Sequence, residues 1–411
     1  ALRTTGHVGE PATASDIYPY TRRHAPSSTL NSSVAEMARW LLVNLNRGVL
    51  DGRRILREAG LRIRVAVGCS LFLCGALPSA QSQPIDTEID SYLSEQIRAS
   101  EIPGLAVAVV HDGSVIFNRA YGVTKLGAEE ELSPEHIFHF ASLSKPFVAT
   151  AIVQLFERGK LELDDPVIKH LPYFRLADER YRDITIRQML NHTAGMPDVE
   201  DYEWDKPQFD DGAAERYVRS LSSKKLLWDP GSGFQYSNIA FDALGDLIAK
   251  VSGLSFEEYM RINILDPVAM ANSSFFYPEV DEALRTTGHV GEPATARDIY
   301  PYHRRHAPSS TLNSSVAEMA RWLLVNLNRG VLDGRRILRD ESYDLLWTST
   351  TDHTVGLSWF IYEEPGIREI LHGGSDLGFS SYIVLDPANG VGIVMVSNWQ
   401  IPETVQDIVY G

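Results

Sequence analysis

The stretch FHFASLSKPFVATAIVQLFERGK, residues 138–160, begins an apolar helix with a serine and a lysine one helical turn apart. The spacing of Phe147 and Leu155 predicts a face turned toward a core, with Ser142 and Lys145 together near the helix N-terminus. Backbone N–H groups there favour developing negative charge. Serine is a weak nucleophile until a base takes its proton, and a lysine can be that base only when its pKa is lowered. The stretch therefore predicts a core helix that presents Ser142 as a candidate nucleophile and Lys145 as its candidate base.

The Ser-x-x-Lys spacing alone is weak evidence, because a chain of 411 residues is expected to contain it by chance about once or twice. Ser222 and Lys225 repeat the spacing in SSKK, within a plain polar stretch. We interpret that second pair as a serine cap with a solvated lysine. The first pair gains weight only if other motifs supply it with partners.

A second motif, PGSGFQYSNIAFDALG, places Tyr236 and Asn238 after a glycine-rich turn and before an apolar helix. A loop at this position presents both side chains. A phenol can relay a proton between a serine hydroxyl and a leaving group, and an amide can hold a substrate carbonyl. With 17 tyrosines in the chain, a purely structural tyrosine is the alternative when this motif is taken alone.

A third motif, HGGSDLGFSSYIVLD, ends a predicted strand in His372, Gly374 and Ser375. Bare glycine backbone lets a substrate lie close, and the Ser375 N–H is a candidate oxyanion donor. The same His-x-Gly spelling occurs at His7, His111 and His289. Only the motif at His372 follows a strand on the C-terminal side of the other two motifs.

The composition describes a globular protein, with 44% hydrophobic and 22% charged residues. A net charge of -16 argues against a nucleic-acid partner or an anionic membrane surface, since either requires a basic face. His303 and His306 in HRRH have no acidic or cysteine neighbour, so we expect them to face solvent rather than a metal ion. The acidic run 200–211 is expected to be a solvated loop.

Residues 61–82 have the layout of a secretory signal, with arginines, then an apolar run over 65–77, then a cleavage box at 80–82. The apolar run is too short for stable membrane insertion. If this internal segment is used, the protein is exported to the periplasm or secreted. Cleavage would remove Cys69 and Cys74, the only cysteines, and with them any disulfide. A buried core helix is the alternative reading of this segment.

Residues 1–57 are a near-identical duplicate of residues 283–339. The differing pairs are Ser15 against Arg297 and Thr21 against His303. Solenoid repeats diverge and stack as neighbours, whereas these two copies lie far apart in the chain. We therefore expect the first copy not to be an independent domain, and either to pack poorly or to compete with the second copy by swapping.

Residues 83–411 read as one domain. Strand patterns fill its two ends, 83–140 and 350–411, and helical patterns fill 141–349. This order predicts an α+β fold, with an antiparallel sheet built from both ends, flanked by helices, and a mostly helical subdomain. The helix that begins at PETVQDIVYG is expected to be truncated, leaving one edge of the sheet bare.

The three motifs, in this order, resemble those of the serine β-lactamase and penicillin-binding-protein superfamily, in the branch of class C β-lactamases, D-stereospecific peptidases and family VIII carboxylesterases. The resemblance covers roughly Asp86 to Gly411 and includes connecting segments such as ITIRQMLNHTAGMPD and SSVAEMARWLLVNLNRG. It implies a β-lactamase/transpeptidase-like fold and acyl transfer through a covalent acyl-serine, with no metal or organic cofactor. The roles it implies are an acylated nucleophile at Ser142, its base at Lys145, proton transfer by Tyr236, acyl-group contact by Asn238, the third motif at His372 and Gly374, and an oxyanion hole formed by the N–H groups of Ser142 and Ser375.

One departure from the family pattern bears on the substrate. His372 stands where class C β-lactamases have a lysine, so a permanent cation for a β-lactam carboxylate is missing at neutral pH. The leading hypothesis is therefore a serine hydrolase acting on a carboxylic ester or a D-amino-acid peptide or amide. The alternatives are a β-lactamase, a penicillin- or peptidoglycan-fragment-binding protein without turnover, and a damaged copy without stable function. The acyl group, the leaving group and the oligomeric state are left open.

Overall fold

The computed structural model describes residues 85–349 and 353–410 continuously, together with four short strands nearer the N-terminus. Those strands form two antiparallel pairs within residues 1–80, which separate from residues 81–411 as a unit of their own. The pairs are β1 (Gly6–Val8) with β2 (Thr13–Ser15), and β3 (Val49–Leu50) with β4 (Arg53–Arg54). The signal-like segment 61–82 and most of the first copy lie outside the described residues, so export and competition between the copies stay predictions.

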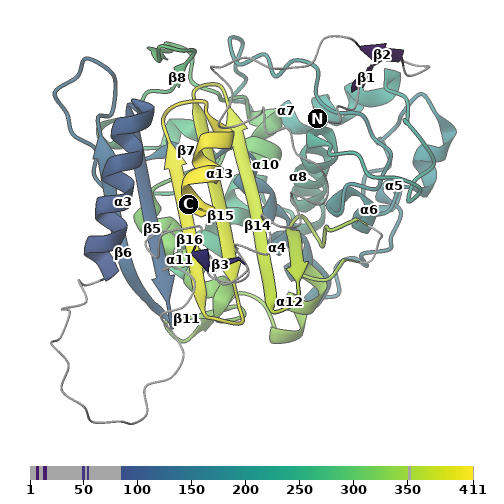
Figure 1. The fold of residues 1–411 in the computed structure, drawn as a ribbon. Helices are drawn as coiled ribbons and strands as arrows, with labels where there is room; N and C mark the ends of the chain where they lie inside the picture. The colour runs from purple at the N-terminus through teal and green to yellow at the C-terminus, as the bar shows by residue number, and fades with distance from the viewer. Residues whose placement is uncertain are drawn as a thin grey trace, which may run out of the picture. The chain divides into compact units, whose positions relative to one another are not determined.

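A six-stranded antiparallel sheet is assembled from the two ends of the larger unit (Figure 1). Its spatial order is β13 (Phe360–Glu364), β14 (Ile367–Asp376), β15 (Phe379–Asp386), β16 (Val391–Ser397), β5 (Gly104–His111) and β6 (Ser114–Gly122). Strand β16 closes on β5 with Val394 opposite Ala108. The hairpin between β5 and β6 turns at Asp112 and Gly113, both with positive φ, as a tight two-residue turn requires. This arrangement confirms the α+β class and the antiparallel sheet built from both ends.

Helices cover both faces of the sheet, which explains why β5 is apolar at successive positions. The covering helices are α3 (Ile85–Ser100) and α13 (Pro402–Tyr410) on one face and α11 (Val316–Leu327) on the other (Figure 1). Because alternate residues of a strand point to opposite faces, Val107 and Val109 join the cluster under α3 and α13, whereas Ala106 and Ala108 join the main core.

The C-terminal helix forms in the stretch where the sequence predicted a helix to begin, and its truncation stays a prediction. Helix α13 has nine residues and buries Val405 and Ile408 against the sheet. The sheet is therefore covered at β15 and β16. None of the helices in the described part of the chain is both long and apolar enough to span a bilayer.

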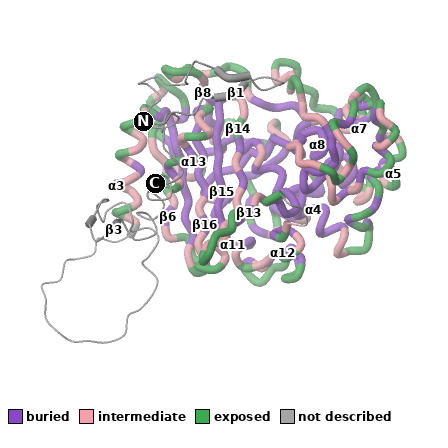
Figure 2. The backbone as a smooth tube through the Cα atoms, turned by 45° about the vertical axis from the view of Figure 1, so that its right-hand side comes forward, coloured by how far each residue is buried: buried purple, intermediate pink, exposed green. Residues whose placement is uncertain are grey.

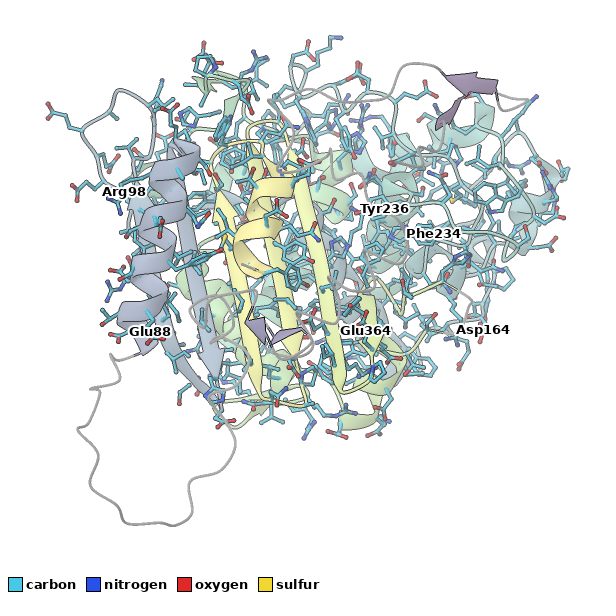
Figure 3. All side chains as sticks on the ribbon, viewed as in Figure 1. Glu88, Arg98, Asp164, Phe234, Tyr236 and Glu364 are labelled. Atoms are coloured by element: carbon cyan, nitrogen blue, oxygen red, sulfur yellow. The ribbon has the colours of Figure 1, made fainter. Side chains whose placement is uncertain are left out.

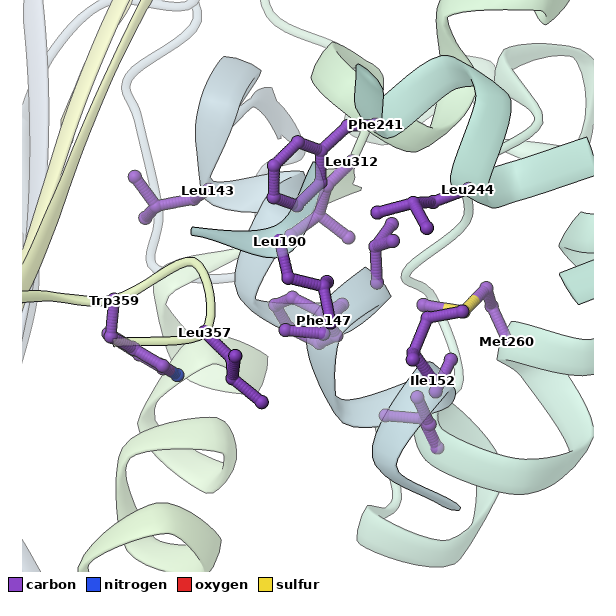
Figure 4. Close-up of a cluster of buried hydrophobic side chains, with 14 of the residues drawn as sticks. Leu143, Phe147, Ile152, Leu190, Phe241, Leu244, Met260, Leu312, Leu357 and Trp359 are labelled. Carbon is purple, nitrogen blue, oxygen red and sulfur yellow. The ribbon is translucent and has the colours of Figure 1, made fainter. Parts of the chain in front are cut away.

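The helical region is organised around α4 (Ser144–Glu157), which is buried at every position from Ser144 to Leu155 (Figure 2). Its neighbours are α5 (Val167–His170), α6 (Ile186–Leu190), α7 (Ala213–Ser220), α8 (Asn238–Ser252), α9 (Phe256–Met260), α10 (Ala307–Ser310) and α12 (Asp340–Leu346). The Phe147 ring stacks on Trp322 of α11 with centroids 3.8 Å apart, and Phe147, Leu190 and Phe241 lie in one cluster (Figure 4). Each such side chain contributes roughly 1.5–3 kcal/mol by burial, so α4 is a rigid support for whatever its first turn carries.

The second copy of the duplicated sequence is an integral part of this domain. It supplies α11, which packs on the sheet, and α10, which packs on α4 and α8. It also supplies the hairpin of β11 (Val331–Leu332) and β12 (Arg335–Arg336). Residues 283–339 thus fill core positions that the fold needs.

Candidate active site

Ser142 lies in a single turn of 3-10 helix, Ala141–Leu143, that leads directly into α4. Ala141 has a φ of +49°, an unusual value for a residue with a Cβ atom, and this bend sets Ser142 at the start of the buried helix. The Lys145 Nζ donates hydrogen bonds to the Ser142 Oγ at 2.9 Å and to the backbone carbonyl oxygen of Ser309 at 2.7 Å. The structure therefore joins the predicted nucleophile and base directly.

The environment of Lys145 changes its acid–base behaviour. The side chain is fully buried, and its ammonium group lies 4.8 Å from the Tyr236 ring centroid. Burial lowers the pKa of Lys145 to about 7, against an opposing effect of the carboxylates of Asp242, Asp198 and Asp376. A lysine with this pKa is substantially uncharged near neutral pH and can accept a proton.

Tyr236, labelled in Figure 3, lies directly before the N-cap residue of α8, and its ring is the one beside the Lys145 ammonium group. Burial raises the pKa of Tyr236, against a smaller lowering effect of the neighbouring Ser142 hydroxyl. The phenol therefore stays protonated at neutral pH, which leaves Lys145 as the group able to take the serine proton. Tyr236 can then pass a proton onward.

The loop that carries Tyr236 is held by residues that the motif search did not single out. Ser237 caps α8 by accepting the Ala240 N–H, and its own N–H donates to the His192 Nδ1 at 3.1 Å. The His192 ring also stacks on Tyr236, with centroids 4.3 Å apart. His192 lies in the segment ITIRQMLNHTAGMPD, so its sequence signal was the resemblance of that segment to the family.

Asn238 begins α8 and faces a carboxylate. Its backbone N–H donates to the Asp198 Oδ1 at 2.8 Å, and its side-chain Nδ2 donates to the same oxygen at 3.0 Å. The Asn238 Oδ1 is buried without a hydrogen-bond partner among the described residues. Its amide is therefore oriented with a free acceptor.

Strand β14 carries the third motif past Ser142. A Cβ atom added at Gly374 would lie 2.4 Å from the Ser381 Oγ, 2.5 Å from the Phe140 carbonyl oxygen and 3.2 Å from the Ser142 backbone nitrogen. Only glycine fits there, and the close approach sets the Ser142 N–H beside the strand that carries Ser375. An oxyanion hole formed by the N–H groups of Ser142 and Ser375 stays a prediction.

His372 is buried and uncharged. Its Nδ1 donates to the Gly373 carbonyl oxygen at 2.7 Å, and its Nε2 has no hydrogen-bond partner within the described ranges. Burial, followed by the nearby charge of Lys145, lowers the pKa of His372 to about 3. The ring lies against Phe360, with centroids 5.4 Å apart. The third motif thus offers a neutral acceptor where a lysine would offer a cation.

One expectation from the sequence is wrong. His303 and His306 do not face solvent: both are buried, and the His306 Nδ1 donates to the Asp242 carboxylate at 2.6 Å. The partner of His306 comes from a distant part of the sequence. The acidic run 200–211 is a largely exposed loop, as expected, and its Trp204 Nε1 donates to the Asp376 carboxylate at 2.9 Å. A search of the described residues finds no cluster of side chains that could hold a metal ion.

The competing motifs lie elsewhere. Ser222 and Lys225 are exposed on a short turn. His111 ends strand β5, and His289 is hydrogen-bonded between the Leu126 N–H and the Asn398 carbonyl oxygen. The side chain of His7 lies outside the described residues. The predicted site residues that the structure brings together are Ser142, Lys145, Tyr236, Asn238, His372 and Gly374. Ser375 follows Gly374 on strand β14.

Comparison with known proteins gives a consistent result. The family model described as Beta-lactamase matches residues 89–409. The chain is 27% identical over 329 residues to Protein flp of Staphylococcus aureus (strain COL), covering 78% of this chain and 65% of that protein. It is 29% identical over 318 residues to Penicillin-binding protein 4 of Amycolatopsis lactamdurans, covering 72% of this chain and 81% of that one. The match thus spans slightly less than two thirds of the staphylococcal relative.

A solved structure shares the fold. The octameric penicillin-binding protein homologue from Pyrococcus abyssi aligns with a TM-score of 0.67 at 25% sequence identity, covering 79% of this chain and 75% of that chain. The aligned share of this chain is large enough to hold the sheet and the helical region together.

Proposed function

The chain belongs to the β-lactamase family, as the sequence resemblance indicated, and from this premise we propose that it is a serine hydrolase that forms a covalent acyl-enzyme on Ser142. The observation that carries the proposal is the 2.9 Å hydrogen bond between the Lys145 Nζ and the Ser142 Oγ, made by a lysine whose pKa burial lowers to about 7. Such a pair supplies a nucleophile together with its base.

The proposed reaction begins when uncharged Lys145 takes the Ser142 proton and the Oγ attacks the substrate carbonyl carbon. The carbonyl oxygen becomes an oxyanion, which the N–H groups of Ser142 and Ser375 stabilise. Tyr236 then delivers a proton to the leaving group as the carbon–leaving-group bond breaks, and protonated Lys145 gives up the proton it took from Ser142 to restore the Tyr236 phenol. Water attacks the acyl-serine in a second cycle, in which the same groups return the Ser142 hydroxyl.

The neutral His372 supports a carboxylic ester or a D-amino-acid peptide or amide as substrate. Efficient binding of a β-lactam draws on a cation for the ring carboxylate, and His372 with a pKa of about 3 carries no charge above acid pH. A second candidate is an acyl-serine that does not turn over, as in a penicillin-binding protein. The similarity to Penicillin-binding protein 4 of A. lactamdurans motivates it.

Labelling with a fluorophosphonate and with a penicillin, followed by intact mass spectrometry, tests the proposal. We expect one fluorophosphonate adduct in the wild-type protein and in Ser222→Ala, and none in Ser142→Ala. Hydrolysis of p-nitrophenyl butyrate should follow the same pattern. A folded wild-type protein that takes no adduct would overturn the serine-hydrolase reading, and a stable penicillin adduct without ester turnover would favour the second candidate.

A further inference from the structure

The surroundings of Ser142 and Lys145 carry negative charge. Asp198 accepts hydrogen bonds from uncharged groups, the N–H of Val199 and the backbone and side-chain amides of Asn238. Asp376, directly after Ser375 on β14, accepts from the Trp204 indole at 2.9 Å, the Ser310 hydroxyl at 3.2 Å and the Leu377 N–H at 2.8 Å. Its other neighbour is the His139 Nε2 at 3.4 Å. Neither carboxylate has a lysine or arginine among these partners.

A third carboxylate lies deeper. Asp242 is buried and accepts from the His306 Nδ1 at 2.6 Å. The Arg305 Nε donates to the other nitrogen of the same ring at 2.9 Å, so His306 is the neutral tautomer protonated on Nδ1. Arg305 is itself paired with Glu203 at 2.7 Å. The charge of Asp242 therefore adds to those of Asp198 and Asp376.

Tyr202 lies within the electrostatic reach of all three carboxylates. Its hydroxyl lies close enough to Asp376, Asp198, Asp242 and Tyr236 for each of them to raise its pKa, after the larger effect of burial. The Tyr202 ring stacks on Trp204, with centroids 4.7 Å apart. Aromatic faces beside carboxylates suit a cationic guest.

Two buried side-chain atoms of the predicted site residues are acceptors without a hydrogen-bond partner among the described residues. The His372 Nε2 carries a lone pair, because the proton is on the Nδ1 that donates to Gly373, and the histidine side chain is 1% exposed. The Asn238 Oδ1 is likewise buried and unpartnered in the described part of the chain. Buried acceptors without a donor are costly, so a ligand that brings N–H groups gains by satisfying them.

From this combination of charge and free acceptors, we infer that the substrate of this site carries a protonated amine on its acyl group, held beside Asp198 and Asp376, and that an acyl group ending in a carboxylate is rejected. This inference rests on the proposed hydrolase function and narrows its substrate class. An ammonium group supplies three N–H donors and a positive charge, and both match what surrounds Ser142. A carboxylate would meet like charges and unpaired acceptors.

A series of p-nitrophenyl esters with acyl groups of nearly equal size tests this inference. The β-alanyl, butyryl and succinyl esters end in an ammonium, a methyl and a carboxylate group at the same distance from the carbonyl carbon. Each kcat/KM is divided by the hydroxide-catalysed rate of the same ester, which removes differences in intrinsic reactivity. At low ionic strength we expect the corrected kcat/KM to fall by at least about tenfold from the β-alanyl to the butyryl ester, and again from the butyryl to the succinyl ester. Added salt should reduce these differences, because it screens the charges.

Variants locate the preference. Asp198→Asn and Asp376→Asn each keep an acceptor oxygen and should lower the β-alanyl-to-butyryl ratio severalfold. His372→Lys should raise the succinyl-to-butyryl ratio. Glu364→Gln makes the same charge change on strand β13, far from Tyr236 (Figure 3), and should leave both ratios unchanged. Because each ratio is measured within one preparation, partial loss of folded enzyme cancels.

The outcomes are separable. If none of the three esters is hydrolysed and no adduct forms on Ser142, the proposed function itself fails. If Ser142-dependent hydrolysis of the butyryl ester is present without the order ammonium, methyl, carboxylate, only the amine inference is overturned. A β-alanyl preference that survives in both aspartate variants also contradicts it, because the charge would then come from elsewhere.

Discussion

Replacing Lys145 by methionine should abolish hydrolysis and, at the same time, stabilise the folded protein at acid pH. Lys145 is fully buried, and its pKa falls from 10.5 to about 7 on folding. At about 1.4 kcal/mol per pKa unit, this shift corresponds to about 5 kcal/mol of folding free energy lost when the group is protonated. The methionine variant avoids that cost but also lacks the hydrogen bonds to Ser142 and Ser309, worth about 2–3 kcal/mol together.

The pH dependence gives this prediction its sign. Between pH 7 and pH 10.5 the unfolded chain binds more protons at this position than the native protein does, so through Lys145 wild-type stability rises with pH across that window. At pH 6 protonation of Lys145 destabilises the wild-type fold by nearly the full amount. At pH 9.5 this destabilisation is only about 1.4 kcal/mol. We therefore expect the variant to be more stable than wild type by about 2 kcal/mol at pH 6, and to lose about 3 kcal/mol of that difference by pH 9.5.

Urea unfolding followed by tryptophan fluorescence at several pH values between 6 and 9.5 measures the difference, with Lys225→Met as the matched control. Lys225 is exposed, so its removal should change the unfolding free energy little and by the same amount at each pH. A Lys145→Met protein whose stability difference from wild type is constant from pH 6 to pH 9.5 would refute the lowered pKa. Retained p-nitrophenyl butyrate hydrolysis in this variant would refute the role of Lys145 as base.

Three further outcomes are expected. The kcat/KM of the wild-type enzyme should rise with pH through about 7, because burial lowers the pKa of Lys145 to about 7 and the uncharged lysine is the base. A kcat/KM that stays constant from pH 5.5 to 8.5 would contradict this. Ser237→Ala should lower the free energy of unfolding by about 1 kcal/mol, because α8 loses its N-cap. Its kcat should also fall, because Tyr236 is no longer held in place. An unchanged kcat would show that the cap does not position the Tyr236 phenol. Gly374→Ala should remove activity, since the added Cβ would lie 2.5 Å from the Phe140 carbonyl oxygen; activity within twofold of wild type would mean that β14 can shift freely.

Local sequence patterns were sufficient for much of the fold. The apolar run after Ser142 specified a core helix, and HDG at His111 specified the turn between β5 and β6. Strand patterns at both ends of 83–411 indicated the antiparallel sheet. These features depend on residues close together in the chain, where periodicity and turn chemistry act directly.

How the three motifs meet in space could not be predicted from local sequence patterns. Similarity to a family could nominate Tyr236 and His372, but only the fold brings them to Ser142 from distant segments. The Ser309 carbonyl that holds Lys145 had no sequence signal, because any residue offers that atom. His306 was misjudged because its partner, Asp242, lies on α8 and is close only after folding.

The sequence by itself determined which groups are present: a serine and a lysine one turn apart, a tyrosine after a glycine-rich turn, and a histidine in place of a lysine. The tertiary structure decided their charges. Burial makes Lys145 a base near neutral pH and keeps His372 uncharged, and the carboxylates of Asp242, Asp198 and Asp376 act on the pKa of Lys145. Desolvation and Coulomb interactions depend on distances through space, and a linear sequence does not contain those distances.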